Sequence, residues 1–542
     1  MHARAEVVGD MYAKITCMSK FYYSIFTAPM ETLEPQPAPG QRQTLVSWLF
    51  PHSERAVARR AKYLEEPEPP KESPNTLAEK DPETFPAEEP GKLHATTTDI
   101  DDVYNGPQIS VHEERDVRAP RTLGSFGAFF NIVAFSVALA VLSIPKVVAV
   151  VGIVPFILMN AAFALLTYLT AREYWKLAMM YPGVHSLEHA GDIIYGPVAA
   201  KSLSFIQLIF CIFLQGNHAL LGGYAFYSLG WHDCMVGLVA VFSVVSFVFT
   251  LPRSYRLFSV LAIISFTSII VVIIIVMISA GVGGPINKSP SRPPVETHAF
   301  GAARGIPHTF IDAMPSVSAL FSCYAAYPTY LPVLAEMRSP RTFNFSLIAV
   351  ACTTFTLYVI VGCVVNNYLG QYAKSPSLAS LTPIMIKVSY GLALPTIMIA
   401  GCASGQVSGK ALYIITFRGR RRHWANKPYV SWTAWIVINI VTWALGFVLA
   451  EVIPFFDSFL GLESALFVSL FFGITGIIYL WRHQFDYRAN WRNALGTFAA
   501  VSIIVIGLFL MIAGIWGAAA LIENQYANGE VGSPFSCAMP DL

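Results

Sequence analysis

Long apolar runs alternate with short polar connections along most of the chain. About eleven of these runs are long enough to cross a bilayer, which takes roughly 20 residues each. Their approximate bounds are 123–150, 153–177, 199–229, 234–251, 256–281, 306–337, 343–370, 382–417, 428–451, 454–481 and 494–521. The pattern predicts an all-α polytopic membrane protein whose transmembrane domain covers residues 121–521.

The first 120 residues differ in composition from the rest of the chain. The stretch 64–92 is rich in Pro, Glu and Lys and contains very few residues that a core could bury. Such a segment does not recover its ordering entropy by burying apolar surface. We therefore predict a disordered cytoplasmic tail over 1–120, which is either simply solvated or a site for regulatory partners. A short tail over 522–542 is expected on the opposite side.

Composition supports the membrane assignment and excludes other classes. Hydrophobic residues make up 54% of the chain and charged residues 13%, and the mean hydropathy is +0.52. These values lie outside the range of soluble domains. The basic residues stand in short clusters between apolar runs, so the net charge of +2 gives no indication of nucleic acid binding. Of the eight cysteines, Cys234 and Cys537 fall in segments expected on the outer side of the membrane, and a bridge between them is left open.

Basic residues set the expected orientation. If the N-terminus is cytoplasmic, the cytoplasmic connections carry most of the Arg and Lys, including Arg172, Arg338 and Arg421. This asymmetry is the positive-inside pattern, and it places the C-terminus outside. Asn287, in the long loop 282–305, then begins an outward-facing glycosylation tripeptide. We expect the protein in the plasma membrane, with the vacuolar membrane as the alternative.

Two spans contain residues that interrupt a helix. The first span has small and β-branched residues from Ser136 to Ser143, followed by Pro145. The sixth span has Pro328 and Pro332 four residues apart. Each proline removes a backbone donor and clashes with the preceding turn, and in hydrocarbon no water satisfies the freed carbonyls. The two spans are equivalent if the chain is two five-span repeats plus one extra helix.

Interrupted helices have a known use in transporters. Proline and small residues also serve kinks and close packing, but their presence at repeat-equivalent positions favours a functional break. Inverted-repeat transporters present half-helix N–H groups to an anionic group and unwound carbonyls to a cation. An amino acid carries both charges. We predict that the carboxylate meets the backbone of Ser136, Val137, Ala138, Leu139 and Ala140, and the ammonium that of Tyr324, Ala325, Ala326 and Tyr327.

Several stretches resemble the amino acid/auxin permease family, in particular its fungal neutral amino acid permeases. They are LAVLSIP (139–145), GNHALLGG (216–223), YPTYLPVLAEMRSPRTF (327–343), KVSYGLALPTIMIAG (387–401), YIITFRGRRRH (413–423) and IPFFDSFLGLESALF (453–467). The resemblance implies an eleven-span leucine-transporter-like 5+5 inverted repeat with one extra helix, and ion-coupled movement of amino acids. Two departures add bulk beside the expected pocket. Ala140 stands where the family has glycine, and Ala326-Tyr327 where it often has Gly-His or Gly-Gln.

Polar residues within the spans are candidates for ion coupling. His218 is the candidate for proton coupling, because imidazole titrates near ambient pH and an intramembrane ionisable group is costly without a role. A locally satisfied histidine is the alternative. Ser404 and Ser408 lie one turn apart and either complete a sodium site against the first span or bond to their own helix. The glycines at 401, 405 and 409 predict close helix packing. The family resemblance favours protons over sodium.

Glu336 ends the sixth span beside Arg338 and Arg341. It is a candidate for an inner gate, with a solvated interfacial cluster as the alternative. Together these features predict a secondary active transporter of neutral amino acids, coupled to protons by alternating access. No cofactor is expected besides the coupling ion. An amino-acid sensor that signals through the N-terminal tail is the alternative. An enzyme is not expected, because the sequence has no HExxH, GxSxG or metal-ligand cluster.

Overall fold

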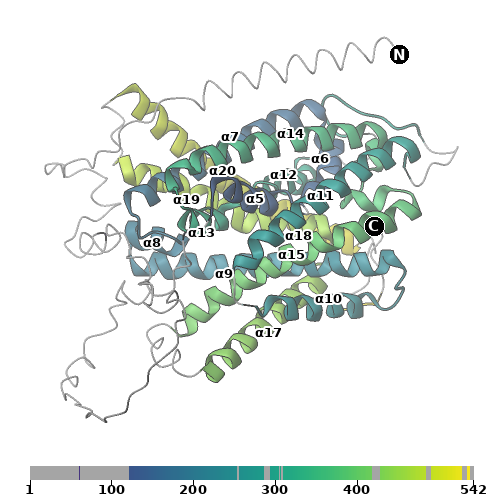
Figure 1. Cartoon of the computed structure of the whole chain (residues 1–542). Helices are drawn as coiled ribbons and strands as arrows, with labels where there is room; N and C mark the ends of the chain where they lie inside the picture. Colours follow the sequence, from purple (N-terminus) through teal and green to yellow (C-terminus); the bar gives the residue numbers. More distant parts are fainter. Residues whose placement is uncertain are drawn as a thin grey trace, which may run out of the picture.

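The computed structural model contains one elongated bundle of helices (Figure 1). It describes residues 60, 121, 123–138, 140–252, 255–285, 293–303, 306, 309–417, 428–483, 490–527 and 534–537. The predicted tail 1–120, apart from Arg60, lies outside these residues, as do Leu139 and Asn287. Within the described part, the one β-type pairing is an isolated bridge between Leu123 and Met337.

Helices occupy the predicted apolar runs, and most of their ends agree within three residues. The first half contains α5 (Ser125–Ser136), η2 (Ala140–Ser143), α6 (Ile144–Val151), α7 (Ile153–Met180), α8 (Leu187–Ile194), α9 (Pro197–Leu229), α10 (Met235–Thr250) and α11 (Tyr255–Gly283). The second half contains α12 (Phe310–Ser322), α13 (Tyr327–Glu336), η3 (Pro340–Thr342), α14 (Phe343–Leu369), η4 (Gly370–Tyr372), η5 (Ser377–Ser380), α15 (Pro383–Thr416), α17 (Pro428–Val452), α18 (Phe456–Glu463), the π-helical turn η6 (Ser464–Val468), α19 (Ser469–His483) and α20 (Trp491–Ala527).

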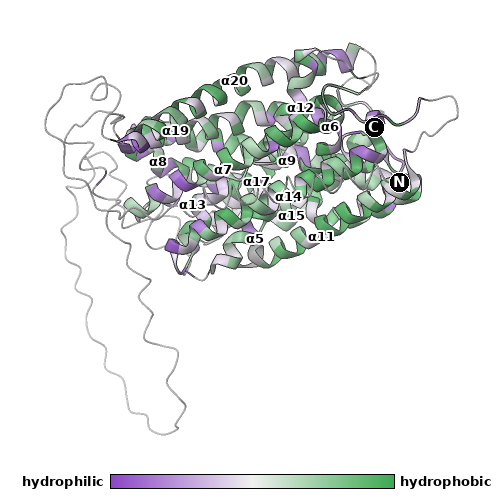
Figure 2. Ribbon diagram, turned by 90° about the horizontal axis from the view of Figure 1, so that it is seen from above, coloured by the Kyte–Doolittle hydropathy of each residue, from purple (hydrophilic) through white to green (hydrophobic). Residues whose placement is uncertain are grey.

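The helices have the length and polarity of membrane spans. Among the described residues, eight are long and apolar enough to cross a bilayer, or nine if α5 and α6 form one bent span. The short helix α10 and the pair α12 and α13 fill the other two expected positions but fall outside that count. Hydrophobic residues cover the length of the bundle and hydrophilic residues gather toward its ends (Figure 2). The all-α polytopic fold class is confirmed, and the count of about eleven spans stays a prediction.

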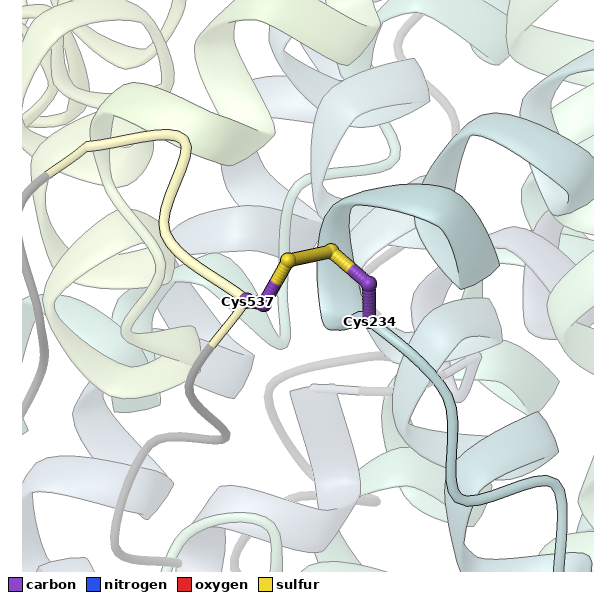
Figure 3. Close-up of a disulfide and its surroundings, with 2 residues drawn as sticks. All are labelled: Cys234 and Cys537. Atoms are coloured by element: carbon purple, nitrogen blue, oxygen red, sulfur yellow. A yellow bond between two sulfur atoms is a disulfide. The ribbon is translucent and has the colours of Figure 1, made fainter.

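A disulfide marks one end of the bundle. Cys234, just before α10, is bonded to Cys537 (Figure 3), and the N–H of Met235 donates to the carbonyl of Cys537 at 3.5 Å. The bridge that the sequence left open is therefore present, and it ties the C-terminal segment to the α9–α10 connection. Following the predicted orientation, we call this end the outer end and the opposite end the inner end.

The inner end contains a helix that the apolar pattern did not predict. The Ser186 hydroxyl accepts from the N–H of His189 at 3.3 Å and caps α8, which packs against α9. Arg60 donates to the carbonyl of Ile193 at 3.3 Å, and its guanidinium lies over the ring of Trp481, 5.0 Å from the centroid. The one described tail residue is thus held at this end.

The glycine stripe of α15 packs closely, as predicted. A Cβ atom added at Gly401 would lie 3.1 Å from Cβ of His218. One added at Gly405 would lie 3.0 Å from Nε1 of Trp443, and one at Gly409 would lie 2.7 Å from Oδ1 of Asn439. Only a residue without a side chain permits α9 and α17 to approach α15 this closely.

Candidate functional site

The first span is interrupted where the sequence predicted. The helix α5 ends at Ser136, and the N–H of Val137 makes the last helical bond, to Val133 at 2.8 Å. After the break, η2 and α6 continue at an angle of 44° to α5. Pro145 falls in the first turn of α6. Its missing N–H costs little there, because the N–H groups of the first turn have no acceptor within the helix. The proline therefore starts the outer half-helix.

The sixth span is interrupted in the same way. The helix α12 ends at Ser322, residues 323–326 are not helical, and α13 begins at Tyr327 with Pro328 in its first turn. Pro332 does not form part of the break, because it lies inside α13. The expectation that both prolines mark the interruption is therefore wrong for Pro332, and the second break spans Cys323 to Ala326.

The two breaks meet at one side chain, Tyr358 of α14, which sequence reasoning missed. Its hydroxyl lies 2.9 Å from the carbonyl oxygen of Ser136 and 2.8 Å from that of Cys323. Tyr358 is 0% exposed. One hydroxyl hydrogen serves one acceptor at a time, so the two freed carbonyls share a single donor. The C-terminal ends of α5 and α12 therefore adjoin.

The predicted pocket tyrosines are held by α7. The Tyr324 hydroxyl donates to Oδ1 of Asn160 at 2.6 Å, and Nδ2 of Asn160 donates to the carbonyl of Phe355 at 3.2 Å. The Tyr324 and Tyr358 rings pack edge to face with centroids 5.4 Å apart. Tyr327 is also buried, beside Thr167 and Thr170 of α7. Both tyrosines therefore lie at the second break with their rings fixed by neighbouring helices.

Several backbone groups at the breaks form no hydrogen bond within the described part of the chain. Among them are the N–H of Ala138 and the carbonyl of Ala325, in residues only 9% and 7% exposed. Buried backbone groups are nearly always paired, because an unpaired one costs the free energy of a lost hydrogen bond. A donor on one break and an acceptor on the other are what a zwitterion would satisfy.

The carbonyls of two other predicted residues, Ala140 and Ala326, already have partners. The carbonyl of Ala140 accepts from the Ser143 hydroxyl at 2.7 Å. The carbonyl of Ala326 accepts from the N–H of Thr329 at 3.0 Å and from its hydroxyl at 2.7 Å. These three bonds keep the chain in tight turns at the starts of the outer half of the first span and the inner half of the sixth. The substrate contacts of the nine residues stay a prediction.

A small cavity opens beside the breaks. It has a volume of about 10 Å³, and its lining includes Ser136, Thr167, Tyr168, Tyr324 and Thr354. This is room for about one water molecule. All the lining residues are apolar, hydroxyl-bearing or aromatic, and none carries a charge at neutral pH. An amino acid enters only if α5, α12 or their neighbours move.

The two ends of the site are closed by different contacts. Toward the outer end, Nζ of Lys146 on α6 lies 2.9 Å from Oδ2 of Asp457 on α18. Toward the inner end, the N–H of Leu123 donates to the carbonyl of Glu336 at 3.0 Å, and the N–H of Arg338 donates to the carbonyl of Leu123 at 2.9 Å. The residue before α5 is therefore hydrogen-bonded through its backbone to the end of α13.

The gate candidate Glu336 forms no ion pair with Arg338 or Arg341 among the described residues. Lys410 on α15 is near enough to act on its carboxyl group electrostatically. A salt bridge to those arginines is therefore not formed in this structure, and the gate role stays a prediction beside the solvated cluster.

Gln215 and Asn217, the neighbours of His218 on α9, contact different helices. Nδ1 of His218 lies 2.6 Å from the carbonyl of Leu214, and the ring packs toward Gly401 of α15. Gln215 accepts from the Ser408 hydroxyl of α15 at 3.0 Å. Asn217 faces the other way and donates to Glu463 of α18 at 3.4 Å. The coupling role of His218 stays a prediction.

The hydroxyls of the serine pair of α15 bond to their own helix and to α9. The Ser404 hydroxyl donates to the carbonyl of Ala400 at 3.0 Å, and that of Ser408 contacts the carbonyl of Gly405 at 2.9 Å as well as Gln215. These are the bonds to their own helix that were the alternative interpretation. A sodium site built from them and the first span stays a prediction that none of these contacts supports.

Comparison with known proteins identifies the family of this chain. The model of the family described as "Transmembrane amino acid transporter protein" matches residues 121–520. The N amino acid transport system protein of Neurospora crassa is 25% identical over 419 residues, which is 75% of this chain and 86% of that protein. A transmembrane transporter of Fusarium pseudograminearum is 24% identical over 448 residues, 81% of this chain and 92% of that protein.

Among solved structures, the crystal structure of MhsT in complex with L-phenylalanine covers 72% of this chain and 98% of its own, with a TM-score of 0.44 and 14% identity. That likeness is too distant to locate a ligand here. The family match, by contrast, covers the whole helical bundle, both breaks included. The chain belongs to the transmembrane amino acid transporter family.

Proposed function

We propose that this protein is a secondary active transporter that carries neutral amino acids across a membrane by proton symport with alternating access. The observation that carries the proposal is the meeting of the two breaks at Tyr358, with an N–H at Ala138 and a carbonyl at Ala325 that have no partner among the described residues. The first group suits a carboxylate and the second an ammonium. The family and the fungal relatives support amino acids as the substrate class.

Neutral substrates are favoured by the lining of the cavity. Its residues include Ala164, Leu347 and Val350 beside hydroxyl groups, and none is charged at neutral pH. A charged substrate side chain would lose its hydration there without gaining a counter-charge, which costs several kcal/mol. The main-chain groups at the breaks are specific only for the zwitterion, so the substrate side chain is selected by this apolar and hydroxyl-bearing surface.

Alternating access is supported by the contacts that close the two ends. The outer side is closed by the Lys146–Asp457 ion pair between α6 and α18, and the inner side by the two backbone hydrogen bonds between Leu123 and the end of α13. In our proposal the two closures open in turn, and the substrate is exposed to one side at a time. Moving one proton charge through 100 mV supplies about 2.3 kcal/mol per cycle.

The proposed orientation has the N-terminus in the cytoplasm and the C-terminus outside, in the plasma membrane. The Cys234–Cys537 bridge supports it, because disulfides persist in oxidising compartments and are rare in the cytosol. The basic connections at the other end support the same orientation. A sensor that signals through the tail receives no support from the relatives, which are described as transport proteins.

Uptake into sealed vesicles tests the proposal. The purified full-length chain is reconstituted, and accumulation of a labelled neutral amino acid is measured with and without an inwardly directed proton gradient. We expect accumulation that needs the gradient and collapses when a protonophore is added. Saturable binding without accumulation would favour the sensor. Accumulation that ignores the proton gradient and follows a sodium gradient would contradict proton symport.

A further inference from the structure

Glu463 is a buried carboxyl group that the proposed substrate site does not use. It is the last residue of α18 and is 1% exposed. Its one side-chain hydrogen bond within the described residues comes from Nδ2 of Asn217 on α9, at 3.4 Å. No Lys, Arg or His of the described chain forms an ion pair with it. The group therefore sits in the bundle interior with a neutral donor and no counter-charge.

Such an environment does not tolerate a permanent charge. A buried carboxylate is stable only if a cation or several strong donors compensate for its lost hydration, and one long amide bond does not do this. The charged state of Glu463 therefore requires water or a new partner, which arrive only when the packing around it changes. A group whose protonation follows conformation is what a proton-coupled cycle needs.

The helix that carries Glu463 connects both outer half-helices. Six residues earlier, Asp457 is ion-paired with Lys146 of α6. Two residues earlier, a Cβ atom added at Gly461 would lie 3.3 Å from the carbonyl of Pro315 on α12, so the two backbones touch. Any movement of α6 or α12 at the outer side therefore acts on α18.

Glu463 also lies where the α-helix of its span is interrupted. It is followed by the π-helical turn η6, Ser464–Val468, where the regular hydrogen-bond ladder of the helix is interrupted. Such turns are uncommon and occur often at functional sites. The hydroxyl of Ser464 and Oδ1 of Asn217 are buried without partners in the described part of the chain. Buried polar atoms able to receive a water are thus found on the next residue of the chain and on the residue that bonds the carboxyl group.

Few other titratable groups share this environment. On α9 the thiol of Cys211 is close enough to interact with Glu463 electrostatically, while the ring of His218 packs toward α15. The remaining titratable or charged residues of the packed elements stand toward the helix ends or belong to the outer ion pair: Lys201, Tyr224 and Tyr227 on α9, Asp312 on α12, Tyr479, Arg482 and His483 on α19, Arg492, Glu523 and Tyr526 on α20, and Asp457 on α18 itself.

We propose that Glu463 is the proton-binding site of the transport cycle. One proton adds to its carboxylate when the amino acid enters from outside, and the same proton leaves when the site opens to the cytoplasm. This inference rests on the proposed symport and replaces the imidazole of His218 as the coupling group. Asn217 is a positioning residue, because its amide holds the carboxyl group between α9 and α18.

The pH dependence of substrate binding tests the assignment. The affinity of the purified full chain for a labelled neutral amino acid is measured from pH 5 to pH 8. For the wild type we expect affinity to weaken as pH rises above a midpoint, up to tenfold per pH unit. In Glu463→Gln that dependence is lost. His218→Gln keeps it, and so does Glu451→Gln, a control carboxyl group that is also buried but lies at the outer end of α17.

The outcomes separate this inference from the proposed function. A wild type that does not accumulate amino acid under a proton gradient refutes the symport itself. A coupled wild type with unchanged pH dependence in Glu463→Gln refutes only the assignment, as does loss of the dependence in His218→Gln. If Glu463→Gln does not fold, the pH dependence of substrate affinity is measured in Asn217→Leu instead. Removing the amide donor disfavours the carboxylate, so we expect the pH midpoint to rise. An unchanged midpoint contradicts the proposal.

Discussion

The hydroxyl of Tyr358 is the contact whose removal most directly perturbs the two breaks. Tyr358→Phe deletes one oxygen atom from a fully buried ring and leaves the carbonyls of Ser136 and Cys323 without their shared donor. The substitution changes little volume, so it creates almost no cavity. Any effect on the protein therefore reports the hydrogen bond rather than the packing.

The size of the effect follows from the geometry. Leaving a buried acceptor unpaired costs about 1–3 kcal/mol in soluble proteins, whereas hydrogen bonds between membrane helices average about 0.6 kcal/mol and reach about 1.7. The Tyr358 hydroxyl has two carbonyls within 3 Å, and both lose their donor. We therefore expect a loss of about 1–2 kcal/mol in the free energy of unfolding.

The assay is chemical unfolding of the purified chain in detergent, with and without a saturating neutral amino acid. The matched control is Tyr390→Phe, since Tyr390 is also 0% exposed but its hydroxyl has no partner in the described chain. We expect Tyr358→Phe to destabilise the empty protein, and saturating substrate to recover part of the loss, because the ammonium that we place at the Ala325 carbonyl has two further N–H groups available to the freed carbonyls. Tyr390→Phe should be neutral or stabilising. Equal effects of the two substitutions would refute the bridging role of Tyr358.

Three further predictions test other parts of the account. Gly216→Ala places a Cβ atom 2.7 Å from the Gly446 carbonyl and should cost about 1–3 kcal/mol of unfolding free energy, whereas Gly237→Ala, with open space around it, should cost nothing. Asp457→Asn removes the carboxylate that pairs with Lys146 and should slow uptake at least several-fold. An unchanged rate would remove the ion pair from the outer closure. A membrane-impermeant maleimide should label Cys234 in sealed cells only after reduction, and labelling without reduction would contradict the bridge.

Sequence reasoning located the breaks because their causes are local. A proline at position 145 or 328 and the small residues around it restrict the helix within a few residues on either side. The glycine stripe of α15 was predicted for the same reason, since four-residue spacing places its members on one face. Helix ends were found from the change between apolar and polar composition, which the bilayer enforces on every span.

The remaining features depend on contacts that the linear sequence does not encode. Tyr358 is one of many tyrosines in apolar runs, and only the fold places its hydroxyl between two carbonyls more than 180 residues apart in the chain. The Lys146–Asp457 pair, the Asn217–Glu463 contact and the disulfide join residues that are far apart in the same way. The short helix α8 is too small to show an apolar period, so its cap at Ser186 was the one available signal.

The central claim is that the bare main chain of two interrupted helices holds both ends of an amino acid. A structure of the full chain with a bound neutral amino acid tests it most directly. We predict the carboxylate within hydrogen-bond distance of the Ala138 N–H and the ammonium within that distance of the Ala325 carbonyl, with the Tyr358 hydroxyl displaced from at least one of its two acceptors. An amino acid bound away from both breaks, with the Tyr358 contacts intact, would contradict the account.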